Sequence, residues 1–396
     1  MQKANQKRTR AHNTRLVLNT IYSEGQISRA EIARKTNLTP PTISDVVSGL
    51  IDDGLVGEMG HAPSSSGRRA ILLDIIDNSR QIIGIDLSRK DFRGAITDLR
   101  GKIDYRVNLD IEGRDGEKAL LLAYDLIDDL VETAKSPILG IGIGAPGLID
   151  SSDGVLQQAV NLNWRHIPLR NLFQDRYNLP VYLANDCQVA ALAEYTFGTS
   201  VDNNLPLVVI NMGWGVGAGI IIAGRLLHGS PIGAGEIGHV RVVENGLKCA
   251  CGNFGCLETI ASNEAIIKRM ESIIFDTPQP SLEKSTPNPN KVDFQDVIAA
   301  LENGNGEVQQ IIYDAGEALG IAAANLVGVL GPCRILIHSR IASLNPLLIE
   351  TIRDTMIERT LPTLARATSV GATTLGSDNV ILGATAQVLQ YELGVL

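Results

Sequence analysis

A histidine and three cysteines whose side chains could bind a metal ion lie close together in the second half of the chain. His239 is followed after nine residues by Cys249, Cys251 and Cys256, so this segment holds three of the five cysteines and one of the six histidines. The glycines between the second and third cysteines let the chain bend back. One histidine and three cysteines are the ligands of closed, four-coordinate zinc sites, which are usually structural. Because nitrogen and sulfur donors favour zinc over calcium or magnesium, we expect a structural Zn2+ here.

A disulfide cluster is the alternative interpretation of these cysteines. The start of the chain is basic and polar and does not have the pattern of a secretory signal peptide. Disulfides persist mainly in oxidising compartments, so the metal site is the favoured hypothesis. No apolar run reaches the length that spans a membrane. We therefore expect a cytoplasmic protein with no membrane partner.

Composition and charge restrict the class of protein further. The 396 residues are enough for two or three domains, and 44% hydrophobic residues with 39 glycines suit an α/β architecture with many glycine turns. The net charge is −9, but residues 1–70 carry 10 Lys and Arg against 6 Asp and Glu. The first segment could therefore approach a polyanion that the acidic remainder repels.

The N-terminal segment has the pattern of three short helices followed by a hairpin. Apolar spacing and capping signals predict helices at residues 12–24, 28–36 and 39–53, the second opening on a capping box and the third on a threonine followed by proline. Strands are expected at residues 55–56 and 70–74. Three helices and a hairpin with a basic tip are typical of a winged helix-turn-helix, which binds DNA.

Two pairs of residues are the candidate DNA contacts in this segment. Thr42 and Ser44 lie on the third helix, which would enter the major groove and which contains no Lys or Arg. Arg68 and Arg69 lie at the hairpin tip, where arginine suits the narrow, negative minor groove of A·T-rich DNA. A small helical protein-binding module is the alternative to a DNA-binding domain.

The body of the chain contains an internal duplication. A buried strand, a turn, a second strand and a corner of Gly followed by Lys or Arg occur at residues 81–103 and again at residues 207–227. The repeat predicts two similar α/β lobes that face each other across a cleft, a common place for ligands. The stretch at residues 277–290, rich in Pro, Ser and Asn, is expected to be an exposed excursion within the second lobe.

Asn185 and Asp186 follow a predicted strand and precede a predicted helix. A carboxylate at a strand end could take a proton from a substrate hydroxyl, but both side chains could equally cap the helix. The glycine-rich run at residues 213–219 resembles a phosphate-binding loop. It lies between two strands and not at a strand–helix junction, so glycines needed for close packing are an equal alternative.

Taken together, these motifs resemble the ROK family of repressors, open reading frames and sugar kinases, over essentially the whole chain. The most specific motif is Gly235-Glu-Ile-Gly-His239 followed by the three cysteines and Leu257-Glu258. The resemblance, closest to the family's repressors of N-acetylglucosamine and xylose genes, implies a duplicated actin-like or hexokinase-like body. The implied domains are a winged helix-turn-helix at 1–75, a first lobe at 81–200 and a second lobe with the zinc loop at 201–396. The residues at positions where the family's kinases contact the hexose are Asn185, Asp186, Glu236, His239 and Glu258.

The chain departs from the kinases of this family at three nucleotide-binding elements. Asp86-Leu-Ser-Arg-Lys stands where the kinases have Asp-x-Gly-Gly-Thr, Asn211 and Trp214 stand at hydroxyl positions of the second phosphate loop, and His338-Ser stands at a pair of glycines beside adenosine. Phosphoryl transfer depends on positioning the phosphates and the metal. We therefore expect no enzyme activity, with Asp186 as a vestigial base; the alternative is an ATP-dependent sugar kinase with an added DNA-binding domain.

The resemblance thus implies a transcriptional repressor that leaves its operator DNA when a sugar or sugar phosphate binds between the lobes. A homodimer or dimer of dimers would place two DNA-binding domains on a palindromic site. The zinc would hold the loop so that Glu236 and Glu258 point at sugar hydroxyls. A repressor whose signal is a protein partner is a third hypothesis.

Overall fold

The computed structural model describes residues 6–62, 70–199, 205–229, 233–276 and 292–395. The chain forms two compact units: the first contains the residues up to Val189 together with Val380–Leu396, and the second contains Ala190–Asn379. Among the described residues, no helix is both long enough and apolar enough to cross a membrane.

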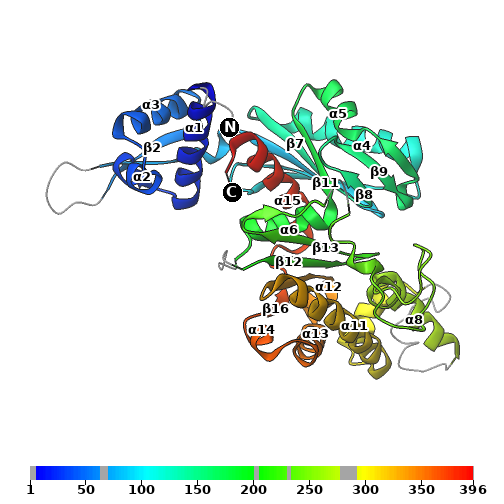
Figure 1. Ribbon diagram of the computed structural model, residues 1–396. Coiled ribbons are helices and arrows are strands. Elements are labelled where there is room, and N and C mark those ends of the chain that lie inside the picture. The colour runs from blue at the N-terminus through cyan, green and yellow to red at the C-terminus, as the bar shows by residue number, and fades with distance from the viewer. Residues whose placement is uncertain (1–5, 63–69, 200–204, 230–232, 277–291, 396) are drawn as a thin grey trace. The chain divides into compact units, whose positions relative to one another are not determined.

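The first unit begins with three helices and a small three-stranded sheet (Figure 1). The helices are α1 (Gln6–Glu24), α2 (Arg29–Thr36) and α3 (Pro40–Asp52), and the strands are β1 (Ile27–Ser28), β2 (Val56–His61) and β3 (Ile71–Ile75). The strand order is β1-β3-β2, all antiparallel. This is the winged helix-turn-helix predicted from the sequence. The first helix begins six residues earlier than predicted, and β1 was not predicted because two residues are too few to show a strand periodicity.

Local sequence signals account for the position of these helices. Ser28 and Glu31 form the predicted capping box of α2, with the Ser28 amide donating to the Glu31 carboxylate at 3.0 Å. The Thr39 side chain accepts from the Thr42 amide as the N-cap of α3. The predicted apolar stripe of α3, including Ile43 and Val47, is buried. Helix α3 is therefore fixed from its first turn and along one face.

The rest of the first unit is built on a five-stranded sheet of order β11-β7-β4-β5-β6. Its strands are β4 (Gln81–Leu87), β5 (Asp91–Thr97), β6 (Ile103–Asp110), β7 (Ile138–Ala145) and β11 (Val181–Asn185). The helices around it are α4 (Gly116–Thr133), α5 (Leu169–Tyr177) and α15 (Asn379–Val388), with the short turns η1 (Asp77–Ser79), η2 (Val160–Leu162) and the π-helical η5 (Leu389–Leu393). A second small sheet is formed by β8 (Leu148–Asp150), β9 (Val155–Ala159) and β10 (Trp164–Ile167).

The second unit has its own five-stranded sheet, of order β14-β13-β12-β15-β16. Its strands are β12 (Leu207–Met212), β13 (Val216–Ile222), β14 (Arg225–Leu226), β15 (Arg334–His338) and β16 (Ser369–Ala372). Its helices and short turns are η3 (Ile237–His239), α7 (Glu258–Ala261), α8 (Asn263–Asp276), α10 (Phe294–Glu302), α11 (Gly306–Leu330), α12 (Arg340–Leu344), α13 (Pro346–Arg359), α14 (Pro362–Arg366) and η4 (Gly376–Asp378). Helix α6 (Asp186–Phe197) begins in the first unit and continues into the second.

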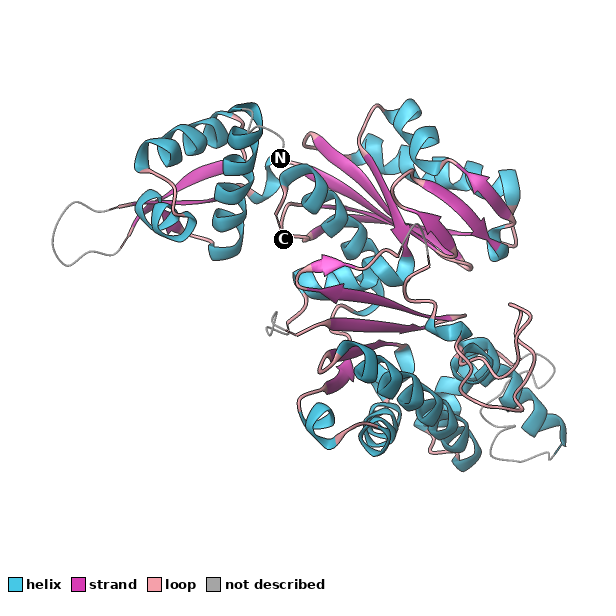
Figure 2. Cartoon of the chain, viewed as in Figure 1, coloured by secondary structure: helices cyan, strands magenta, loops and turns pink. Residues whose placement is uncertain are grey.

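The two sheets have the same topology, which confirms the predicted duplication (Figure 2). In each, a central strand pairs antiparallel with the next strand of a hairpin and parallel with a later strand: β4 with β5 and β7, and β12 with β13 and β15. The corner after each hairpin contains a glycine with positive φ, Gly101 at 79° and Gly224 at 74°. This left-handed conformation favours glycine and explains why both repeats carry one there.

Helix α15 returns the end of the chain to the first sheet. Two glycines of the sheet allow α15 to pack closely against it, because neither has a side chain. A Cβ at Gly142 would lie 2.0 Å from the Ala384 carbonyl oxygen, and a Cβ at Gly84 would lie 2.5 Å from the Ile381 carbonyl oxygen. Residues 380–396 therefore group with the first unit. The three-domain division at 1–75, 81–200 and 201–396 remains a prediction.

Candidate metal centre and ligand-binding residues

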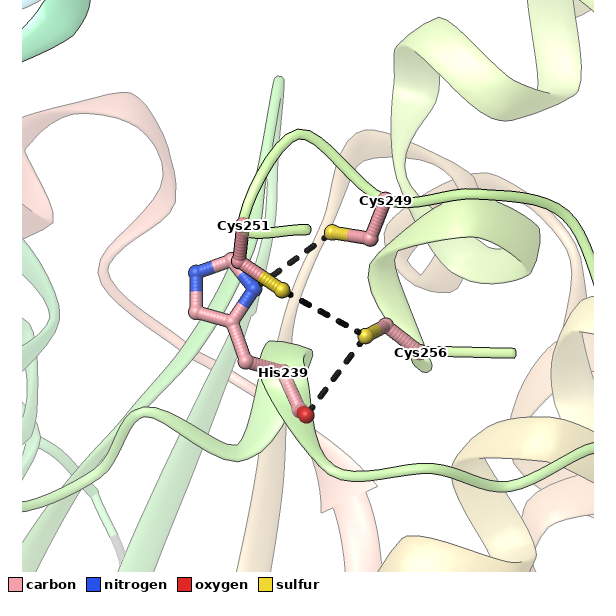
Figure 3. A group of neighbouring side chains, drawn as sticks. All are labelled: His239, Cys249, Cys251 and Cys256. Atoms are coloured by element: carbon pink, nitrogen blue, oxygen red, sulfur yellow. Dashed lines mark hydrogen bonds between the residues drawn. The ribbon is translucent and has the colours of Figure 1, made fainter. Parts of the chain in front are cut away.

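The four predicted metal ligands converge on one point of the second unit (Figure 3). His239 ends η3, Cys249 and Cys251 lie on a turn, and Cys256 lies two residues before the start of α7. The Cys251 and Cys256 sulfurs are 3.7 Å apart, and the Cys249 sulfur is 3.6 Å from the His239 Nδ1 atom. All four donor atoms lie within 4.8 Å of one another.

These distances fit a tetrahedral metal ion. Sulfur ligands at about 2.3 Å from a zinc ion in tetrahedral geometry are roughly 3.8 Å from each other, close to the separations found here. Cys249 and Cys256 are buried, His239 is half-buried and Cys251 is exposed, so the cluster lies at the surface with two of its four donors shielded. The donor set and its spacing thus suit a closed zinc site.

The cysteine turn depends on a glycine. Gly255 has φ of 70°, and a Cβ at this position would lie 1.8 Å from the Val243 carbonyl oxygen. The Gly255 amide donates to the Leu247 carbonyl at 2.9 Å. No other residue fits this conformation and this close contact, so the glycine before Cys256 determines where the fourth ligand lies.

The buried Cys256 thiol of this cluster is a weak acid when no metal is bound. Burial, together with hydrogen bonding to the Cys251 and Cys249 sulfurs, raises the pKa of Cys256 to about 12. Since a metal binds the thiolate, metal binding must displace these protons. The affinity of the cluster for metal should therefore fall as the pH is lowered.

Glu236 and His239 join this cluster to a second group of side chains. The His239 Nδ1 atom faces the cysteines, while its Nε2 atom lies 3.9 Å from the Glu236 carboxylate. Burial raises the pKa of Glu236, with a contribution in the same direction from the Glu258 charge and an opposing one from His239. The His239 ring therefore lies between the candidate metal ligands and the Glu236 carboxylate.

Glu258 connects the same region to the glycine-rich hairpin formed by β12 and β13. It is the first residue of α7, and its Oε2 atom accepts a hydrogen bond from the Val216 amide at 3.1 Å. A Cβ at Gly215 would lie 2.6 Å from the same oxygen. Of the five predicted sugar contacts, Glu236, His239 and Glu258 therefore lie together in the second unit.

Asn185 and Asp186 lie in the first unit, at the end of β11. The Asn185 Nδ2 atom donates to the Gly147 carbonyl at 3.0 Å. The Cys187 amide donates to Asn185 Oδ1 at 2.9 Å and to Asp186 Oδ1 at 2.8 Å. Both side chains thus make the capping bonds that were one of the two interpretations of this motif. A role in ligand binding remains a prediction.

Internal polar contacts are made in two of the segments where the sequence predicts that nucleotide-binding elements have been lost. Asp86 is buried and forms an ion pair with Arg93 on the neighbouring strand. Burial raises the pKa of Asp86, and the Arg93 charge opposes this. In the second unit the His338 ring contacts the Thr373 hydroxyl at 3.1 Å and the Asn379 amide at 3.3 Å. Asp86 and His338 are therefore both engaged by polar side chains of the same unit.

The predicted DNA contacts on α3 differ in the exposure and the hydrogen bonding of their hydroxyl groups. Ser44 is exposed on α3, whereas the Thr42 hydroxyl is 2.9 Å from that of Thr39 and is shared with the helix cap. Arg68 and Arg69 lie outside the described residues. Ser44 is therefore the freer of the two helix positions.

Arg100 is a structural residue that the sequence analysis did not identify. It lies at the corner after β5, and its guanidinium donates to the Tyr22 carbonyl at 2.5 Å and to Asp74 Oδ1 at 2.8 Å. It also covers the Tyr22 ring at 4.5 Å, and the Tyr22 hydroxyl donates to the Leu99 carbonyl at 2.9 Å. These contacts attach the winged helix to the first lobe. They join residues 26 to 78 positions apart, which no local spacing could reveal.

Sequence profiles place both parts of this architecture in known families. The profile of the ROK family matches residues 82–391, and a profile described as winged helix-turn-helix DNA-binding matches residues 10–56. The chain belongs to the ROK family. This family contains both repressors and kinases similar to the present chain.

Three members of the family show the range of similarity. The xylose repressor of Caldicellulosiruptor bescii is 34% identical over 382 residues, with 95% of both chains covered. The crystal structure of a ROK family transcriptional regulator, a homologue of the E. coli MLC protein, is similar with a TM-score of 0.85 and 28% identity over 97% of this chain and 98% of that one. A ROK family glucokinase from Streptomyces griseus, in complex with glucose and AMPPNP, has a TM-score of 0.71 and 26% identity, covering 78% of this chain and 99% of the glucokinase.

The coverage distinguishes the regulators from the kinase. The two regulators align with nearly the whole chain, whereas the glucokinase aligns over almost its full length with only part of it. The present chain is therefore a ROK body with the additional DNA-binding domain that the regulators share.

Proposed function

We propose that this protein is a transcriptional repressor of carbohydrate genes that leaves its operator DNA when a sugar or sugar phosphate binds to the ROK body. The main support is the presence of a winged helix-turn-helix at residues 10–56 on a ROK body at residues 82–391. Full-length similarity to a xylose repressor favours the same function. A DNA-binding regulator acts where the chromosome is, so we place the protein in the cytoplasm.

An inactive nucleotide site is part of this proposal. Kinases of this fold bring phosphates close to a glycine-rich backbone, and here Arg93 and His338 take part in internal polar contacts beside the corresponding elements. Catalysis of phosphoryl transfer consists mainly of positioning and electrostatic stabilisation of the phosphates. We infer that the body binds a sugar without phosphorylating it, with Asp186 as a vestigial base.

The proposed sugar contacts are Asn185, Asp186, Glu236, His239 and Glu258. Carboxylates and amides pair well with hydroxyl groups, and a buried polar group left without a partner costs about 1–3 kcal/mol. Such a site would therefore reject sugars that lack a hydroxyl at the matched position. Glu236 and Glu258 support this role because they lie beside the His239 ring and the glycine-rich hairpin, respectively.

The metal is proposed to be one structural Zn2+ per chain. His239, Cys249, Cys251 and Cys256 would hold it, and the ion would crosslink η3 to the segment before α7. The support is the spacing of the four donors and their nitrogen and sulfur chemistry. The ion would fix the His239 ring and keep Glu236 and Glu258 in place for the sugar.

The proposed DNA complex has two copies of the chain on a palindromic operator, as a homodimer or a dimer of dimers. Thr42 and Ser44 would contact bases, and Arg68 and Arg69 would enter the minor groove. Replacing both arginines with alanine should weaken binding and reduce the slope of log affinity against log salt by about 1 for each lost phosphate contact. Ser44→Ala should instead change sequence preference.

One experiment on the full chain tests the central proposal. An operator is first selected from a random duplex pool, and its affinity is measured with and without D-xylose, D-glucose, N-acetyl-D-glucosamine and the 6-phosphates of the two hexoses. Thermal unfolding with the same compounds reports binding without DNA, because a ligand of the native state raises the unfolding temperature. We expect one compound both to weaken operator binding and to raise the unfolding temperature.

Two outcomes would contradict the proposal. A chain that selects no DNA sequence would remove the regulator function. Turnover of any of these hexoses with Mg·ATP at roughly 1 s⁻¹ or faster, a rate ordinary for enzymes, would instead favour the kinase alternative. Asp186→Asn is the matched control, because it removes the base of a kinase but leaves the DNA-binding domain intact.

A further inference from the structure

The last turn of the chain contacts both the strand that carries Asn185 and the first helix of the DNA-binding domain. Tyr182 on β11 stacks on Tyr391, with ring centroids 4.6 Å apart and planes 3° from parallel. The Tyr182 hydroxyl donates to the Glu392 carboxylate. The carbonyl of Tyr391 in turn accepts a hydrogen bond from the Arg15 guanidinium of α1 at 3.4 Å. One π-helical turn, η5, thus joins β11 to α1.

The contact between α1 and the end of the chain is close as well as polar. Gly394 has φ of 65°, and a Cβ on it would lie 2.8 Å from Arg15 Cδ and 2.9 Å from Cγ. The neighbouring Leu393 and Val395 are buried, which holds the segment in place. The Arg15 stem therefore rests against a backbone surface that only glycine leaves open.

Tyr182 and the candidate sugar contacts lie on the same short strand. Strand β11 runs from Val181 to Asn185 and pairs in parallel register with β7 along its length. Asn185 ends the strand, and Asp186 begins the helix that follows. A shift at one end of a five-residue strand reaches the other end, since a paired strand moves as a unit.

The stack has room to move. An open cavity of about 340 Å³ lies beside it, lined among others by Ser151, Arg170, Tyr182 and Tyr391. The Arg170 guanidinium donates to the Ser151 and Ser152 carbonyls, and its Nε atom donates to the Val181 carbonyl at the start of β11. Tyr391 can therefore change position without displacing packed side chains on that side.

The two attachments of the DNA-binding domain differ in strength. The Arg100 corner makes charge-assisted bonds to Asp74 and Asp77 and a cation–π contact to Tyr22. The contact of η5 and the following Gly394 with α1 consists of one long hydrogen bond from the exposed Arg15 and the packing of its uncharged stem on Gly394. The Arg100 contacts would hold the DNA-binding domain at one point, while the weaker contact at η5 can change. A small shift of η5 would therefore tilt α1.

We propose that η5 transmits sugar binding from β11 to α1, with Tyr182, Glu392 and Arg15 as positioning residues for release from DNA. The inference rests on the proposed function, because it requires a ligand at Asn185 and Asp186. The ligand shifts β11, Tyr182 carries η5 with it, and the Arg15 contact forms or breaks. A ligand changes DNA affinity only through such a difference between two states.

The test compares Tyr182→Phe with Tyr177→Phe in the full chain. Both changes remove one phenol hydroxyl bonded to a carboxylate, that of Glu392 for Tyr182 and that of Asp128 for Tyr177. The Tyr177 hydroxyl donates to the Tyr124 carbonyl and to Asp128, and so binds to α4 and not to η5. For each protein, operator affinity is measured with and without the saturating sugar found above, and sugar affinity is measured without DNA.

The quantity that decides is the ratio of operator affinities without and with sugar. Tyr182→Phe should lower this ratio at least fivefold while leaving sugar affinity unchanged, and Tyr177→Phe should keep the wild-type ratio. Gly394→Ala, which displaces Arg15 without removing its charge, should lower the ratio in the same way.

An unchanged ratio in both Tyr182→Phe and Gly394→Ala overturns the inference while leaving the proposed function intact. A wild-type ratio of one, with sugar bound, overturns the proposed function and the inference with it.

Discussion

The hairpins β4–β5 and β12–β13 occupy equivalent positions in the two duplicated sheets, yet their turns are held by different chemistry. In the first, a buried Asp86 pairs with Arg93 across the two strands. In the second, the turn is formed by glycines, and the Glu258 carboxylate from α7 accepts the Val216 amide. The first turn is closed by charges of its own hairpin, and the second is open to a side chain from elsewhere.

The difference shows how a duplicated fold can divide its functions. The second hairpin is bonded to α7, whose first residue follows the candidate metal ligand Cys256 by two positions, so its shape is linked to the candidate metal cluster. The first hairpin carries its own ion pair, between Asp86 and Arg93. Breaking each arrangement separately should therefore give different losses: ligand binding in the second unit, and stability in the first.

The largest effect is expected from Cys256→Ser. Removal of one ligand from a closed four-coordinate site should abolish stoichiometric zinc and lower the free energy of unfolding by about 4 kcal/mol or more, in the range of lost metal sites. Elemental analysis and chemical unfolding measure both. Cys333→Ala is the control, since this buried cysteine lies outside the cluster. Wild-type protein purified without chelator but free of zinc would contradict the metal assignment.

A smaller effect is expected from Arg93→Met, which leaves Asp86 buried without its partner. Breaking a buried ion pair on one side costs about 3–5 kcal/mol. Burial already raises the Asp86 pKa, and without Arg93 it acts unopposed, so the folded state holds the proton more tightly than the unfolded one. Stability of the variant should therefore fall as the pH rises above the ordinary aspartate value of about 3.9.

Denaturant unfolding at a series of pH values measures this loss. The double variant Asp86→Asn with Arg93→Met should recover most of the stability and lose the added pH dependence. A single variant as stable as wild type at neutral pH would show that the charge pair does not hold the first hairpin.

Gly215→Ala tests the second hairpin without touching the metal. Its Cβ would lie 2.6 Å from Glu258 Oε2, so the carboxylate must move. We expect roughly tenfold weaker sugar binding, the size of one lost polar contact, with a full equivalent of zinc retained. Titration calorimetry measures the affinity. Gly371→Ala on β16 is the control, since its Cβ would meet only Leu336 Cδ2, at 3.8 Å; equal losses in both variants would argue against a role for Glu258.

The smallest effect is expected from Arg89→Gly, which restores one glycine of the kinase-like turn. Asp86 and Arg93 remain paired in this variant, and the His338 contacts in the other unit are unchanged. No ATP-dependent phosphorylation of D-glucose should appear in a coupled assay. Measurable turnover would mean that the first turn alone separates this chain from a kinase.

Residues whose partners are close in sequence could be placed without the structure. The Ser28 capping box, the Thr39 cap and the cysteine spacing are local, and each lies where it was predicted. The duplication was visible because its glycine corners repeat in the sequence. Such local patterns can be interpreted from the sequence because the backbone geometry of a cap or a turn restricts which residue types can stand there.

Contacts between distant residues could not be predicted in this way. The Arg100 corner and the stack of Tyr182 on Tyr391 join segments 78 and about 210 positions apart, and no periodicity connects them. The two residues of strand β1 form a strand because they pair with β3, more than 40 positions later in the sequence. The pairing of Asp86 with Arg93 depends on hairpin register, which neither residue type specifies.

The return of α15 to the first sheet also determines the order in which the protein can fold during synthesis. The DNA-binding domain is formed by residues close in sequence and can fold early. The sheet face beside Gly84 and Gly142 stays uncovered until residues 380–388 leave the ribosome, about 240 positions after the second of these glycines. Contacts over such separations form slowly. Nascent chains therefore expose an apolar sheet face for most of their synthesis, and chaperone demand should depend on the last helix.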